Sequence, residues 1–122
     1  MAGRRHDSLV EWLQKKDPSV QTKGFRAAVK AMLEQELGIE VEDQLSWLSM
    51  IPDAYRVSPG QVVAYEVEDT HRVSRKKMLK YARLWYGFRE LGDDELLEFR
   101  LVIMDIRGGV IEPDLAAWWY QG

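Results

Sequence analysis

The chain has 122 residues, of which 46% are hydrophobic and 30% charged, and its formal net charge is −3. This length and composition predict a single globular domain over residues 1–122. The absence of cysteine excludes disulfides, thiolate zinc sites and a cysteine nucleophile. With no apolar leader and no apolar run long enough to cross a membrane, the sequence predicts a cytoplasmic, intracellular protein.

Charged residues are segregated along the chain. Lys and Arg concentrate in residues 1–30 and 71–91, whereas Asp and Glu concentrate in residues 31–70 and 92–122. An acidic centre between basic segments suits a metal site that also holds a polyanion. The alternative is that the basic segments are solvated helix faces, and both interpretations stay open.

The first two expected elements are helices. One is predicted to end near Lys16, and a second to run over residues 24–37 and end at Gly38 as its C-cap. At a spacing of about 100° per residue, Glu36 falls on the apolar face of the second helix. This carboxylate either joins a site at the helix end or reaches past the core to solvent.

A strand and a hairpin are expected next. Residues 44–50 (QLSWLSM) are predicted to form a strand, and residues 51–70 a pair of strands joined by Ser58-Pro59-Gly60. Proline fixes φ in such a turn, and glycine tolerates a positive φ. The second strand of the hairpin is apolar from Val62 and ends in Glu66-Val67-Glu68.

Three carboxylates are expected to converge at the end of this hairpin. Because side chains alternate across a strand, Glu66 and Glu68 point to the same face. Asp53 in the preceding strand is placed to face the same spot. Three converging carboxylates repel one another, so a positive group is needed nearby, and a divalent cation is one candidate.

The rest of the chain supplies a helix, a strand and a short terminal helix. Ser74 is expected to cap a helix over residues 75–91, with a buried apolar stripe and basic residues toward the other side. The apolar run at residues 99–106 is typical of a central strand. A short C-terminal helix follows Pro113.

The motif and the order of elements resemble the PD-(D/E)xK phosphodiesterase superfamily, which has the restriction-endonuclease-like fold. Pro52-Asp53 matches the first half of its motif, and Glu66-Val67-Glu68 matches the second half with Glu68 in place of the lysine. The resemblance covers about residues 24–107. It implies an α/β fold with an αβββαβ core, in which helices flank a mixed central sheet of about four strands.

The resemblance also implies a cofactor, Mg²⁺ or Mn²⁺, which polarises the scissile phosphodiester and lowers the pKa of the attacking water. Hard oxygen ligands suit these ions. Four groups are implied as ligands: Asp53, Glu66, the backbone carbonyl of Val67, and an acid of the core helix, for which Glu36 is the candidate.

The replaced lysine must be supplied from elsewhere, and some branches of the superfamily carry it on the following helix. Lys77 is the first choice, and Lys77-x-x-x-Tyr81 is similar to the Gln-x-x-x-Tyr element of exonuclease branches. Glu68 is then a further catalytic group, as a metal ligand or general base. Alternatively, it forms a plain salt bridge with Arg72 or Arg100.

The implied function is a small metal-dependent nuclease that hydrolyses phosphodiester bonds in DNA. Its expected partners are nucleic acid and either a second copy of the chain or a protein that gives specificity. One alternative is an inactive nuclease-fold protein that binds nucleic acid or a protein, and another is a small α/β interaction module whose acidic hairpin is mere surface. The residues expected to contact nucleic acid are Arg72, Arg75, Lys76, Lys80, Tyr81 and Arg83.

Overall fold

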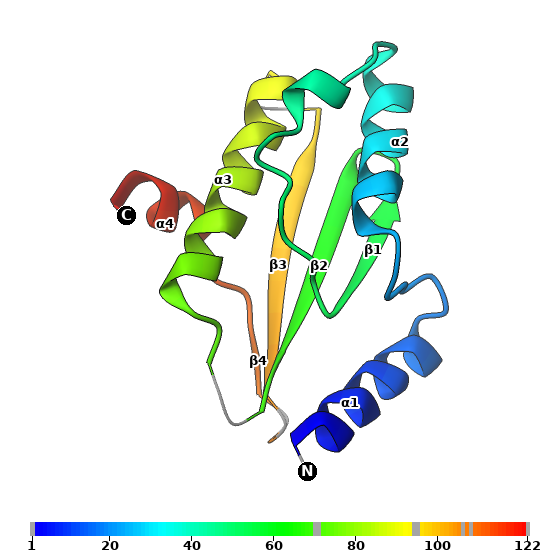
Figure 1. Ribbon diagram of the computed structural model, residues 1–122, viewed down its shortest axis with the longest axis vertical. Coiled ribbons are helices and arrows are strands. Elements are labelled where there is room, and N and C mark those ends of the chain that lie inside the picture. The colour runs from blue at the N-terminus through cyan, green and yellow to red at the C-terminus, as the bar shows by residue number, and fades with distance from the viewer. Residues whose placement is uncertain (1, 70–71, 94–95, 106, 108, 122) are drawn as a thin grey trace.

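The computed structural model describes residues 2–69, 72–93, 96–105, 107 and 109–121, which form helices around one sheet (Figure 1). No helix in this described part is both long and apolar enough to cross a membrane. In chain order the elements are α1 (Ala2–Lys16), α2 (Phe25–Leu37), the 3₁₀ helix η1 (Glu42–Gln44), β1 (Ala54–Ser58), β2 (Gln61–Glu68), α3 (Arg75–Leu91), β3 (Glu98–Asp105), β4 (Val110–Ile111) and α4 (Leu115–Gln121).

The strands form one mixed sheet of four strands in the order β1-β2-β3-β4. The β1 and β2 strands are an antiparallel hairpin, β2 and β3 are parallel, and β4 pairs antiparallel with β3. Parallel neighbours need a crossover connection, and α3 supplies it between β2 and β3. The expected α/β class with a mixed four-stranded sheet is therefore confirmed.

The strand expected at residues 44–50 does not form, and this prediction is corrected. The segment contains the end of η1 and a turn in which the Leu48 N–H donates to the Leu45 carbonyl at 2.9 Å. Leu45 and Leu48 are both buried. Residues three apart share one side of a helical turn but lie on opposite sides of a strand. The core order is therefore αββαβ in place of αβββαβ, and this segment crosses the sheet between α2 and α3 (Figure 1).

The core lies between the sheet and the two helices α2 and α3, which cover the same face of it (Figure 1). Alternation along β2 directs Val62 and Ala64 to this face, where both are fully buried. Tyr81 of α3 stacks on Phe99 of β3, with the ring centroids 6.0 Å apart. Glu66 lies two residues after Ala64 and four after Val62, so its side chain is on the same face of β2. The carboxylate therefore lies at the end of the row of buried core side chains on this strand.

A glycine in the middle of α3 makes room for a tryptophan of the preceding segment. The ring of Trp47 packs edge to face with Phe88, at 6.2 Å between centroids. A Cβ on Gly87 would lie 2.6 Å from Cε2 of the Trp47 ring, inside van der Waals contact. Glycine inside a helix costs about 0.5–1 kcal/mol relative to alanine. Glycine is therefore needed at position 87, despite its low helix propensity, because the Trp47 ring lies against the α3 backbone.

Gly87→Ala is expected to lower the free energy of unfolding by about 1–3 kcal/mol, because overpacking at Trp47 outweighs the better helix propensity of alanine. Urea denaturation followed by circular dichroism measures it. In a Trp47→Ala background, the same substitution is expected to be neutral or stabilising by up to about 1 kcal/mol. Stabilisation by Gly87→Ala in the wild-type background would show that the ring does not rest on Gly87.

Candidate active site

Two of the predicted acidic residues meet where β1 begins and β2 ends. Ala54 pairs with Tyr65, so Asp53, which directly precedes β1, lies opposite Glu66. The Asp53 N–H donates to Glu66 Oε2 at 3.2 Å, and the Val67 N–H donates to Asp53 Oδ2 at 2.7 Å. Each carboxylate is thus fixed by a backbone group of the opposite strand.

Helix α3 supplies two further groups that contact Glu66. The Tyr81 hydroxyl donates to Glu66 Oε2 at 3.0 Å, and the Lys77 ammonium forms an ion pair with Glu66 Oε1. Lys77 and Tyr81 are four residues apart, so they lie on the same side of the helix. Glu66 is only 3% exposed, whereas about a third of the Lys77 side chain is exposed. The buried carboxylate therefore joins the hairpin to α3 and has a cation on its solvent side.

The environment of Glu66 favours its neutral form more than water does. Burial raises the pKa of the Glu66 carboxyl, the hydrogen bond from Lys77 opposes this, and the neighbouring Asp53 charge raises it further. Burial and the Glu66 charge also raise the pKa of Tyr81, which keeps the phenol protonated as a donor. A buried acid with an altered pKa beside a specific cation is typical of functional sites.

The third predicted acid, Glu68, has a different partner. Its Oε1 accepts a hydrogen bond at 3.0 Å from the Val73 N–H, in the segment that leads into α3. Glu68 lies two residues beyond Glu66, which is about 7 Å farther along the strand. Arg100, one expected partner of Glu68, instead forms a two-pronged ion pair with Glu112 at 2.6 and 2.8 Å. In this structure, Glu68 therefore anchors the connection to α3.

Glu36 does not reach this site, so its expected role as a ligand is corrected. The first residue of α2, Phe25, packs against Tyr55 at the start of β1, with centroids 5.1 Å apart. That end of α2 is therefore the one near Asp53. Glu36 lies eleven residues farther along, which is about 16 Å at 1.5 Å per residue. Among the residues that the structure describes, no three His, Cys, Asp or Glu side chains lie close enough to hold a metal ion.

The site that does assemble offers two carboxylates, those of Asp53 and Glu66. Magnesium is commonly bound through one or two carboxylates, with waters and substrate phosphates completing its shell. The two acids are within that number, and the role of Asp53 and Glu66 as metal ligands stays a prediction. Val67 contributes its N–H to Asp53 here. The ligand role implied for its carbonyl stays a prediction.

The basic residues expected to contact nucleic acid lie mostly on the surface beside this site. Arg72, Arg75, Lys76 and Lys80 are exposed, and Arg83 is partly exposed. Tyr81 is fully buried, so its expected contact with nucleic acid is corrected: its hydroxyl serves Glu66. A shallow pocket of about 260 Å³ opens beside the site, lined by Met50, Ile51, Ser74, Lys76, Lys77 and Lys80.

Comparisons of the chain with family models, with curated proteins and with solved structures find no match. The geometry of the site combines a buried carboxylate, a second carboxylate on the adjoining strand, and a lysine that faces a pocket lined with further lysines. The site thus places two carboxylates next to a group of lysines.

Proposed function

We propose that the chain is a small metal-dependent nuclease that hydrolyses phosphodiester bonds in DNA. The observation that supports this most strongly is the contact between Lys77 and the buried Glu66. The hairpin carries Glu68 where the resembled motif has its lysine, and α3 brings a different lysine to the same carboxylate. The ammonium group of Lys77 thus lies beside Glu66, although the motif itself has no lysine.

In the proposed mechanism, Asp53 and Glu66 would hold the metal ion, which would supply Lewis acidity toward the phosphate and a more acidic bound water. Lys77 orients the attacking water or the phosphate through its ammonium group. Tyr81 and the backbone N–H of Asp53 keep the Glu66 carboxylate in place. Lys76 and Lys80 at the pocket offset the charge of the DNA backbone.

Cleavage of labelled single- and double-stranded DNA with Mg²⁺ or Mn²⁺ tests this proposal. Asp53→Asn is expected to lower the rate by at least about 10²-fold, because the amide keeps the hydrogen bond from Val67 but loses the charge that holds a cation. Chelation with EDTA is expected to abolish cleavage. The matched control is Asp43→Asn, which changes an exposed acid of η1 and is expected to cut like the wild type.

The alternative function is a nuclease-fold protein that binds nucleic acid without cutting it. The position of Glu68 favours it, since this residue replaces the motif lysine and contacts Val73. The same assay separates the two functions. Equal absence of cleavage for wild type and Asp53→Asn on every substrate, with DNA binding retained by both, would refute the nuclease and leave the binding protein.

A further inference from the structure

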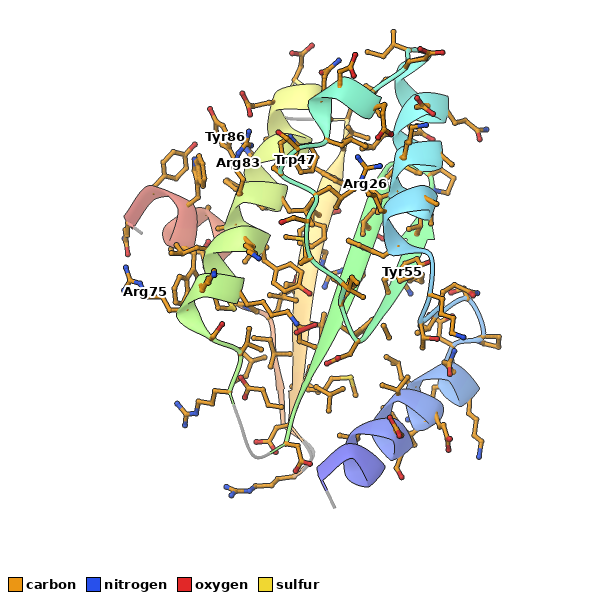
Figure 2. The ribbon with its side chains drawn as sticks, viewed as in Figure 1. Arg26, Trp47, Tyr55, Arg75, Arg83 and Tyr86 are labelled. Carbon is orange, nitrogen blue, oxygen red and sulfur yellow. The ribbon has the colours of Figure 1, made fainter. Side chains whose placement is uncertain are left out.

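Beyond the acidic site, α3 carries a cation among three aromatic rings. The Arg83 guanidinium lies 5.8, 5.7 and 5.6 Å from the ring centroids of Trp47, Tyr86 and Trp119, respectively. Tyr86 and Trp119 are stacked, with centroids 4.7 Å apart and planes inclined by 18°. Figure 2 shows Arg83, Trp47 and Tyr86 close together, toward the end of α3 opposite Arg75. We call Trp47, Arg83, Tyr86 and Trp119 the aromatic cluster.

The aromatic cluster lies at the surface. All four side chains are partly exposed, in contrast to the fully buried Tyr81 and Phe88 on the same helix. Arg83 also pairs with Glu90 at 3.3 Å, but neither side chain is buried: Arg83 is 37% exposed and Glu90 52%. Exposed ion pairs of this kind contribute little stability, so a phosphate can replace Glu90 as the partner of Arg83 at small cost.

A line of basic residues connects the active-site pocket to this cluster. Lys76, Lys80, Arg83 and Gly87 are spaced by four, three and four residues, which places them on one face of α3. Lys76 and Lys80 line the pocket beside Glu66, and Gly87 lies under the ring of Trp47. From Lys76 to Arg83 the helix advances about 10 Å.

We infer that this face of α3 binds a single-stranded stretch of nucleic acid that leaves the active site. Its phosphates lie along Lys76, Lys80 and Arg83, and an unpaired base stacks on the aromatic cluster. Sites for single strands combine a cationic track with exposed aromatic rings in this way. A duplex presents its phosphates but keeps its base faces covered, so the rings would add nothing to duplex binding. The inference rests on the proposed function, because the track starts at the nuclease site.

The test is fluorescence anisotropy of a labelled oligothymidylate and of a duplex of equal length, in EDTA so that no cleavage occurs. Trp119→Ala is expected to weaken binding of the single strand by about 5- to 150-fold, the range for losing one stacked base, and to leave duplex binding unchanged. The control is Trp12→Ala, which removes a more exposed tryptophan on α1 that likewise contacts a cation, Lys16. It is expected to bind like the wild type.

Two further variants keep the test decisive if Trp119→Ala loosens α4. Trp119→Phe retains a ring and is expected to retain most of the affinity for the single strand. Arg83→Gln is expected to lower the slope of log affinity against log salt by about one, as for the loss of one phosphate contact. Equal binding by Trp119→Ala and the wild type, or equal weakening for the single strand and the duplex, would overturn the inference.

The outcomes also separate this inference from the proposed function. Cleavage by the wild type together with unchanged binding by Trp119→Ala refutes the stacking site and leaves the nuclease intact. Stacking-dependent binding without any cleavage in Mg²⁺ or Mn²⁺ supports the inference and refutes the nuclease. Failure of the wild type to bind either nucleic acid would refute the inference and favour a protein as the partner of this surface.

Discussion

Lys77→Met is expected to slow metal-dependent DNA cleavage by about 10²- to 10⁴-fold, the contribution typical of a group that transfers or orients a proton. Among the residues that the structure describes, Lys77 is the cation paired with Glu66. Methionine keeps most of the aliphatic length of lysine, so the packing at the start of α3 is preserved. Single-turnover cleavage at saturating enzyme measures the chemical step without the contribution of DNA affinity.

The matched control for this substitution is Lys30→Met. Lys30 is also 35% exposed and also pairs with a glutamate, Glu34 at 3.6 Å, but both residues lie on α2, away from the site. Lys30→Met is expected to cleave at the wild-type rate. Cleavage by Lys77→Met at the wild-type rate would show that Lys77 only balances the charge of Glu66, and the search for the catalytic cation would then move to Lys76 and Lys80.

The pairing of Asp53 with Glu66 could be predicted because it depends on local chemistry. Pro59-Gly60 is a two-residue loop, and Gly60 has the positive φ of +75° that a type II turn needs after its proline. A loop of known length fixes the register of a hairpin. From the sequence, the turn at Ser58-Pro59-Gly60 places Asp53 near the end of the second strand, and the two-residue loop of the structure places it directly opposite Glu66.

Other features depended on packing that the sequence does not state. The periodicity of α2 gives the face on which Glu36 lies, but the position of that residue along the sheet depends on how the helix docks. The short apolar segment with Leu45 and Leu48 fits a strand by composition and a helical turn by spacing. The surface position of Trp47 could not be predicted for the same reason; the glycine inside α3 is a signal that could have indicated a ring packed there.

Glu66→Gln is expected to abolish cleavage and, at neutral pH, to raise the free energy of unfolding by an amount on the order of 1 kcal/mol. The amide removes the charge whose burial is unfavourable, and its oxygen can still accept from Tyr81 and from the Asp53 N–H. Lys77 is partly exposed, so its ammonium can turn to water when the carboxylate is gone.

The pH dependence of this gain follows from the direction of the shift. The pKa of Glu66 is raised above its ordinary value of 4.5, so the folded protein holds a proton over a range of pH in which the unfolded chain has lost it. Stability from this group is therefore fully present below about pH 4.5 and is lost as pH rises through the folded pKa. The advantage of Glu66→Gln over the wild type is expected to be small near pH 4 and to grow toward neutral pH.

Urea denaturation in EDTA at pH 4 and pH 7 measures this difference, with Glu11→Gln on the exposed part of α1 as the control that should show no such growth. Lower stability of Glu66→Gln at pH 7 would mean that the ion pair with Lys77 outweighs the cost of burial. Higher stability combined with lost cleavage would mean that the chain keeps a destabilising carboxylate because the reaction needs its charge.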